Sequence, residues 1–213
     1  DISDYTAVDP IFGDMADFEE MVKVGQQYGI DFMLDMVLNH CSIEHEWFQK
    51  ALAGDSYYQD FFILRDEPTD WLSKFGGSAW APFGDTGKYY LHLYDVTQAD
   101  LNWRNPNVRQ ELFIVVNFWR DKGVKGFRFD VINVIGKDEV LLDCPEQEGK
   151  PAYTDKPIVH DYLRMMNEAT FGQDDSFMTV GEMSATTIEN CILYTAPDRQ
   201  ELSMAFNFHH LKV

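Results

Sequence analysis

The feature that most constrains this chain is a set of short apolar runs that each carry a carboxylate at or near their carboxyl end. Residues 30–38 form one such run and contain Asp35, while residues 126–131 and 178–182 contain Asp130 and Glu182. The first run is mostly apolar and continuous rather than alternating, which is typical of a strand buried on both faces of a parallel sheet. Ionisable side chains are rarely buried without a partner, so their placement predicts an active edge of the sheet.

Helical patterns separate these runs. Asp14 is an expected N-cap of a helix that stops near Gly29, and Pro106 stands near the start of a helix that stops at Gly123. Further helices are predicted over residues 160–171 and 187–194, and a fourth strand over residues 202–208. This alternation predicts an α/β fold, namely the central part of a (β/α)8 TIM barrel.

Residues 41–103 interrupt the alternation. They are rich in aromatic residues, glycine and aspartate, with turn signals at residues 75–78 and 84–87 and a short strand pattern at residues 89–94. A structureless loop of this length is improbable, so we expect a small inserted subdomain. The expected organisation is a barrel segment over 1–40, the inserted subdomain over 41–103 and a second barrel segment over 104–213.

The composition limits the partners. A formal charge of -19 argues against nucleic acid and against an anionic membrane surface, and no apolar stretch reaches the length of a membrane span. The three cysteines, Cys41, Cys144 and Cys191, follow no metal-ligand pattern and suit free thiols in a reducing cytoplasm. His40 and His45 lack the spacing of a zinc motif, so no metal and no cofactor is expected. We expect a cytoplasmic enzyme whose partner is a small molecule.

Glycoside hydrolysis is the chemistry that needs two carboxylates in different environments. Arg128 lies two residues before Asp130 on the same strand, so it points the same way and favours the ionised form of Asp130, as a nucleophile requires. Glu182 has no basic neighbour in the sequence and is followed by Met183, which suits a general acid and base.

These residues also resemble a known family. Residues 35–40 (Asp-Met-Val-Leu-Asn-His), 126–130 (Gly-Phe-Arg-Phe-Asp) and 180–182 (Val-Gly-Glu) look like three of the four signature regions of the α-amylase family, glycoside hydrolase family 13, in the right order. Residues 98–102 (Gln-Ala-Asp-Leu-Asn) resemble a further region of its inserted B domain, in the form typical of the oligo-1,6-glucosidase group.

The resemblance implies a retaining mechanism with Asp130 as the nucleophile and Glu182 as the acid and base. It implies that Arg128 orients Asp130, and that Asp35 and His40 help shape the pocket for the non-reducing sugar. The barrel strands present would be the third to the sixth of eight.

A narrower resemblance concerns the substrate. Residues 73–80, 179–184 and 206–213 look like the members of the family that hydrolyse trehalose 6-phosphate to glucose and glucose 6-phosphate. It implies a sugar-phosphate substrate whose phosphate would find donors in three basic residues near the end of the chain, His209, His210 and Lys212.

Three other functions are compatible with these residues. One is a glucosidase for neutral α-1,6-linked glucosides, such as an oligo-1,6-glucosidase or dextran glucosidase. Another is a non-catalytic relative that serves as a partner subunit, against which the intact Asp130, Glu182 and Arg128 speak. A third is transglycosylation within the same family.

The third catalytic carboxylate of the family has no match in residues 1–213. An eight-stranded barrel typically needs about 250 residues. The expectation is therefore an incomplete barrel that is inactive on its own.

Overall fold

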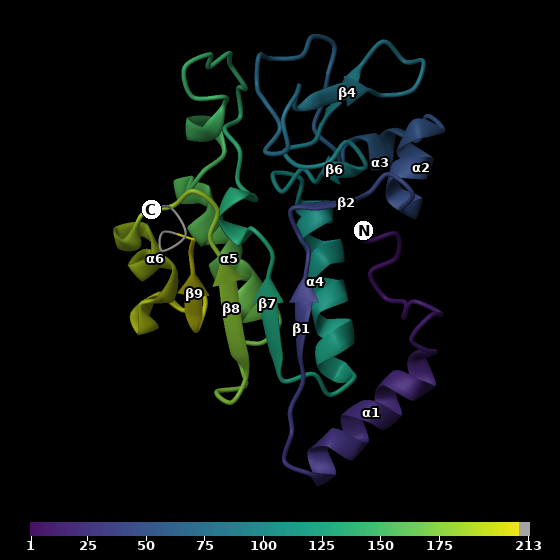
Figure 1. Ribbon diagram of the computed structural model, residues 1–213, viewed down its shortest axis with the longest axis vertical. Helices are drawn as coiled ribbons and strands as arrows, with labels where there is room; N and C mark the ends of the chain where they lie inside the picture. The colour runs from purple at the N-terminus through teal and green to yellow at the C-terminus, as the bar shows by residue number, and fades with distance from the viewer. Residues whose placement is uncertain (209–213) are drawn as a thin grey trace.

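Four parallel strands form the sheet at the centre of residues 1–208, the part of the chain that the computed structural model describes. Their bounds are Met33–Met36 (β1), Gly126–Phe129 (β7), Met178–Glu182 (β8) and Met204–Phe206 (β9). They lie side by side in the order β1-β7-β8-β9 (Figure 1). The parallel arrangement confirms the α/β prediction, and all four carboxyl ends meet at one edge of the sheet.

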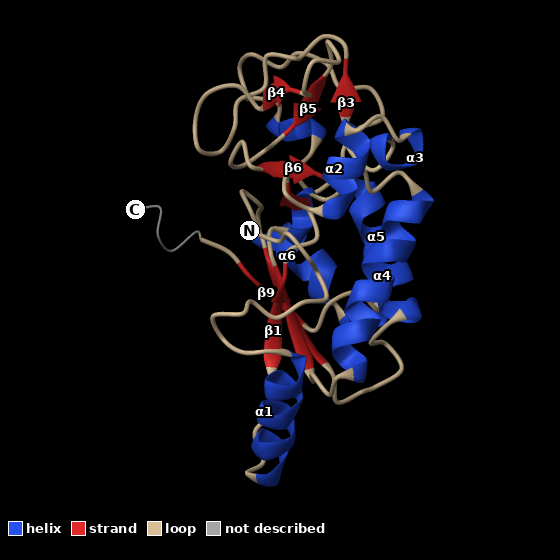
Figure 2. Cartoon of the chain, turned by 90° about the vertical axis from the view of Figure 1, so that its right-hand side faces the viewer, coloured by secondary structure: helices blue, strands red, loops and turns tan. Residues whose placement is uncertain are grey.

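A helix precedes each of these strands. The helices are Met15–Gln27 (α1), Pro106–Asp121 (α4), Pro157–Ala169 (α5) and Ile188–Thr195 (α6), with single 3-10 turns at Ile132–Val134 (η1), Lys150–Ala152 (η2) and Pro197–Arg199 (η3). Figure 2 shows α4 and α5 together along one side of the sheet. No helix within residues 1–208 is long and apolar enough to cross a lipid bilayer.

The helix signals of the sequence operate as expected. Asp14 caps α1 by accepting hydrogen bonds from the backbone N–H groups of Ala16 and Asp17, and the Asp17 side chain accepts from the backbone N–H of Asp14. This reciprocal capping box satisfies N–H groups that have no partner within the helix. Gly29, just beyond the helix, has φ +69°, the left-handed conformation that glycine adopts without strain.

The burial of the first strand differs from the prediction. Met33 is 41% exposed and Asp35 is also exposed, whereas only Met36 of β1 is buried. Within residues 1–208, β1 pairs with β7 alone and is an edge strand of the sheet. The apolar run correctly marked a strand, but a strand with one neighbour has one open side.

Short elements occupy residues 40–100, at the carboxyl-end edge of the parallel sheet (Figure 1). The strands are His40–Ser42 (β2), Leu64–Arg65 (β3), Trp80–Pro82 (β4), Tyr89–Leu91 (β5) and Gln98–Asp100 (β6), and the helices are Glu46–Leu52 (α2) and Ser56–Gln59 (α3). β2 pairs with β6, and β3-β5-β4 form a second antiparallel sheet.

Aromatic packing holds these short strands together. The buried ring of Phe48 meets Phe62, Phe83 and Tyr90 edge-on at centroid distances of 5.1, 5.4 and 5.1 Å. Such pairs add about 0.5–1.5 kcal/mol each beyond the area they bury. Packing is therefore the main role of these aromatic side chains, because the strands of this segment are too short to form many backbone hydrogen bonds between them.

Candidate active site

Strand register brings the signature side chains together. Asp35 of β1 stands opposite Arg128 of β7, and Phe129 of β7 stands opposite Gly181 of β8, so that Asp130 and Glu182 follow at the same edge. Parallel strands in register therefore convert three distant sequence regions into one site, as in barrel enzymes that carry their chemistry at the strands' carboxyl ends.

Arg128 is the centre of this site. Its Nη1 donates to Asp35 Oδ1 at 2.7 Å, to Asp35 Oδ2 at 2.8 Å and to Asp130 Oδ1 at 2.8 Å, and its Nη2 forms an ion pair with Glu182. Burial alone would lower the pKa of Arg128, but the carboxylates of Asp35 and Asp130 outweigh it and raise that pKa above its ordinary value. The guanidinium stays charged and holds three carboxylates in one cluster.

The contact between Arg128 and Glu182 differs from what sequence proximity suggests. Glu182 has no basic neighbour along the chain, yet Arg128 reaches it across the sheet because Arg128 and Val180 are register partners. The two carboxylates instead differ in depth, since the side chain of Glu182 is 11% exposed and that of Asp130 is 23% exposed. Met183, fully buried beside Glu182, supplies the apolar neighbour that the sequence indicated.

His40 lies buried next to this cluster. Its Nδ1 is 3.2 Å from the Asn39 side-chain nitrogen, its ring lies 5.5 Å from the ring of Tyr94, and its carbonyl accepts from the Tyr5 hydroxyl. Burial lowers the pKa of His40, against the opposing effects of Asp100 and Asp130. His40 is therefore held neutral near neutral pH.

Lys137 ties the site to residues 98–100. Its ammonium lies 2.8 Å from Asp100 Oδ2 and donates to Asn39 Oδ1 at 2.6 Å, while Asp100 Oδ1 accepts from the backbone N–H of Leu93 at 2.9 Å. Lys137 and Asp100 are 4% and 0% exposed. The sequence gives no signal that pairs Lys137 with Asp100, because a distant partner for one lysine leaves no local pattern.

The lowered pKa of His40 has a consequence for stability. The folded state binds a proton at His40 less readily than the unfolded state, whose value is near 6.5. The contribution of neutral His40 to the free energy of unfolding is fully present above pH about 6.5 and is lost as the pH falls through the pKa of His40 in the folded state. We expect the urea midpoint to fall between pH about 7.5 and about 5, and to fall less in His40→Gln. His45, whose pKa is also lowered by burial, is present in both proteins, so equal falls would contradict the assignment to His40.

The basic residues expected to bind phosphate, His209, His210 and Lys212, lie outside the described residues. Besides Lys137, the lysines Lys74 and Lys150 lie near the end of β8. Lys74 donates to Ser184 Oγ at 3.4 Å, two residues beyond Glu182, and its ammonium lies 5.2 Å from the centre of the Tyr153 ring.

Lys74 and Lys150 line a cavity of about 500 Å³ beside the end of β8. Its other lining residues are Met183, Ser184, Ala185, Thr186, Asn207 and Phe208. The two lysines are the charged side chains among these lining residues, and Lys150 is also ion-paired with Glu148.

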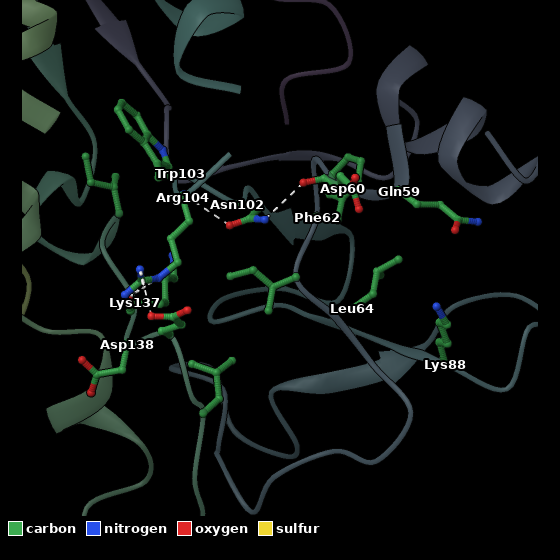
Figure 3. A pocket seen from close by; sticks show the side chains of 14 residues that line it. Gln59, Asp60, Phe62, Leu64, Lys88, Asn102, Trp103, Arg104, Lys137 and Asp138 are labelled. Carbon is green, nitrogen blue, oxygen red and sulfur yellow. Dashed lines mark hydrogen bonds and ion pairs between the residues drawn. The ribbon is translucent and has the colours of Figure 1, made fainter. Parts of the chain in front are cut away.

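A second cavity, of about 360 Å³, lies between residues 59–64 and the loop after β7 (Figure 3). Asn102 and Arg104 project toward it, and Asn102 donates to the Asp60 carbonyl at 3.2 Å. Of the described site residues, Lys137 reaches its wall, but Asp35, Asp130 and Glu182 are not among its lining residues. This second cavity is therefore separate from the carboxylate cluster, and the candidate active site is the cluster around Arg128.

No group of three histidine, cysteine, aspartate or glutamate side chains suited to a metal ion occurs in residues 1–208. The cluster at Arg128 consists of three acidic side chains, Asp35, Asp130 and Glu182, around one guanidinium.

The catalytic-domain family described as alpha amylase matches residues 1–213 in full. The chain belongs to the alpha-amylase family. Members of this family known as trehalose-6-phosphate hydrolases, from Bacillus subtilis (strain 168) and Escherichia coli (strain K12), are 50% and 49% identical over the whole chain. An oligo-1,6-glucosidase from Parageobacillus thermoglucosidasius is 44% identical over 99% of the chain.

Solved structures of similar proteins have the same fold. The crystal structure of Bacillus licheniformis trehalose-6-phosphate hydrolase superposes with a TM-score of 0.96 at 52% identity and over 100% of this chain. The chain covers 39% of that structure and 39% of the two trehalose-6-phosphate hydrolase sequences. The parallel sheet and its helices are thus a section of a TIM barrel, as the sequence predicts.

Proposed function

We propose that this chain is the catalytic part of a retaining α-glucosidase that hydrolyses trehalose 6-phosphate to glucose and glucose 6-phosphate. The observation that carries the proposal is the single guanidinium of Arg128 shared by Asp35, Asp130 and Glu182. It brings two carboxyl groups close together, as a double-displacement mechanism on one sugar ring requires.

In the proposed mechanism the Asp130 carboxylate attacks the anomeric carbon while protonated Glu182 donates its proton to the glycosidic oxygen. The bond to the leaving sugar breaks, and a covalent glucosyl ester forms on Asp130. Glu182, now ionised, takes a proton from water, whose oxygen attacks the same carbon and releases Asp130. Asp35 and His40 border the sugar site, and Arg128 orients Asp130 by a hydrogen bond of 2.8 Å.

Two findings support the phosphorylated substrate. Two of the most similar relatives are trehalose-6-phosphate hydrolases, and the cavity beside Ser184 places two lysines next to the site. Lysine ammonium groups bind phosphate oxygens by charge-assisted hydrogen bonds. His209, His210 and Lys212 are proposed as further donors. The similarity to oligo-1,6-glucosidase favours neutral α-1,6-glucosides as the second candidate substrate.

The assay that tests this function compares trehalose 6-phosphate with isomaltose in the natural protein that contains this chain. We expect a strong preference for the phosphorylated sugar. Equal or better cleavage of isomaltose would contradict the phosphate assignment and favour the second candidate. Cleavage of neither sugar would contradict the glucosidase itself.

Replacing Lys74 by glutamine is expected to lower kcat/KM for trehalose 6-phosphate by about 10- to 100-fold, the usual value of a hydrogen bond to a charged group. Isomaltose carries no phosphate, so its cleavage should change by less than about twofold. Lys88→Gln is the matched control, because Lys88 lines the cavity away from the carboxylates. An equal loss on both sugars would contradict a role for Lys74 in phosphate binding.

The remaining proposals concern organisation and surroundings. Residues 1–40 and 104–213 are proposed as barrel segments and residues 41–103 as an inserted B subdomain. Cys41, Cys144 and Cys191 are free thiols, which supports a cytoplasmic location, and the charge of -19 argues against a nucleic-acid partner.

A further inference from the structure

The buried side chain of Asn133 joins the ends of the two strands that carry the proposed catalytic carboxylates. Asn133 lies in η1, three residues after Asp130, and is 0% exposed. Its Nδ2 donates to the Ser184 carbonyl at 2.8 Å, and its Oδ1 accepts from the Ser184 backbone N–H at 2.8 Å. Ser184 lies two residues after Glu182, so the Asn133 side-chain amide makes two hydrogen bonds to the backbone just beyond Glu182.

Asp155 fixes Asn133 from the other side. Asn133 Nδ2 donates to Asp155 Oδ1 at 2.9 Å, and the Asp155 backbone N–H donates to the Asn133 carbonyl at 3.1 Å. The same carboxylate accepts from Thr186 Oγ1 at 2.6 Å, Asn190 Nδ2 at 2.9 Å and the Tyr194 hydroxyl at 3.0 Å. The loop before α5, the loop after β8 and helix α6 thus meet at one satisfied carboxylate.

Unusual backbone geometry gathers at these contacts. Val131, Asp155 and Ala185 have φ of 38°, 49° and 51°, and they are three of the five non-glycine residues with positive φ in residues 1–208. The left-handed conformation is an outlier for a β-branched residue such as Val131. Such strain persists where the surrounding structure fixes it and concentrates at functional sites. Here one strained residue directly follows Asp130 and another follows Ser184.

We propose that Asn133 is a positioning residue that sets Glu182 against Asp130. The inference rests on the proposed glucosidase function. Asn133 bridges the strained turn after Asp130 and the turn after Glu182, so its loss frees one carboxyl group to move relative to the other. Displacements of about 1 Å at a reacting centre reduce rates by about 100-fold.

The kinetic test measures Asn133→Ala on two substrates that differ in their need for an acid. We expect kcat for trehalose 6-phosphate to fall by about 10- to 100-fold with KM little changed, because proton donation from Glu182 requires exact placement. An aryl glucoside with an acidic phenol leaving group needs little protonation to form the glucosyl ester, so its kcat/KM, which excludes the later step in which Glu182 acts as the base, should fall much less. Asn133→Asp keeps an acceptor for the Ser184 N–H but sets a second buried carboxylate 2.9 Å from that of Asp155, so a loss at least as large as that of Asn133→Ala is expected.

Asn190→Ala is the matched control. Asn190 donates to Asp155 at the same 2.9 Å as Asn133 but, unlike Asn133, does not bridge to Ser184 within residues 1–208, so its loss should lower stability without changing the ratio of the two kcat/KM values. Equal losses on both substrates in Asn133→Ala, or an unchanged kcat in the folded variant, would overturn the proposal.

A crystal structure of Asn133→Ala gives a readout that does not depend on turnover. We expect the Glu182 carboxyl group to shift or to occupy more than one position, while Asp130 remains on Arg128. An unmoved Glu182 would overturn the positioning role, whereas an inactive native protein with a shifted Glu182 in the variant would contradict only the proposed function.

Discussion

Asp130→Asn is expected to lower kcat on trehalose 6-phosphate by about 10⁴-fold or more, the scale seen when an enzyme loses its nucleophile. An amide is too weak a nucleophile to form the glucosyl ester, and it also removes a negative partner 2.8 Å from Arg128. The loss should be equally severe on an aryl glucoside, because both substrates need Asp130 to form the glucosyl ester. Steady-state rates on both substrates provide the measurement.

Glu182→Gln is the control that separates the two carboxylates. Removing a general acid costs about 10²–10⁴-fold on a sugar leaving group. The cost should shrink on an aryl glucoside, whose phenolate leaves without a proton, and formation of the glucosyl ester should then be seen as a burst of phenol. If Asp130→Asn rather than Glu182→Gln were rescued by the aryl substrate, the proposed roles would be reversed.

Lys137→Met is expected to lower the free energy of unfolding by about 3–5 kcal/mol, the usual cost of breaking a buried ion pair from one side. Burial lowers the pKa of Lys137, and Asp100, 2.8 Å away, offsets only part of that effect. Methionine fills much the same space but leaves Asp100 buried without its cation. Urea denaturation of the natural protein that contains this chain, followed by tryptophan fluorescence, measures the change.

Lys50→Met is the matched control for this loss. Lys50 pairs with Glu46 on the exposed face of α2, where solvent weakens the attraction, and the urea midpoint should not move beyond error. Adding Asp100→Asn to Lys137→Met should restore part of the stability, since no unpaired charge then remains buried. A Lys137→Met protein as stable as the native one would contradict the assignment of the pair as a structural charge pair.

The fold could be predicted to the extent that it depends on local pattern. Asp14, Pro106 and Gly123 mark helix boundaries through capping, a fixed φ and a left-handed stop, and each acts within a few residues of itself. The exposure of Met33 could not be predicted this way, because it depends on how many neighbours β1 has in the sheet. The pattern of apolar residues within a strand does not show where that strand lies in the sheet.

The site could be predicted where side chains sit at strand ends. Asp35, Arg128, Asp130 and Glu182 meet as expected because parallel register carries them to one edge. The ion pair from Arg128 to Glu182 and the bonds from Asn133 to Ser184 could not be predicted, since they join residues more than fifty positions apart. A single asparagine or lysine in a loop gives no periodic or spacing signal that would name its partner.

Under the proposed function, the unequal charge around Arg128 bears on which half of an asymmetric disaccharide is transferred. Arg128 is shared by Asp35, Asp130 and Glu182, so the innermost site is net negative even with Glu182 protonated and repels a phosphate dianion, whereas Lys74 lies 3.4 Å from Ser184 Oγ, two residues beyond Glu182. A sugar phosphate is then expected to bind with its unmodified glucose ring innermost. On that proposal the phosphorylated half is the leaving group, and the half that forms the ester with Asp130 is unmodified glucose.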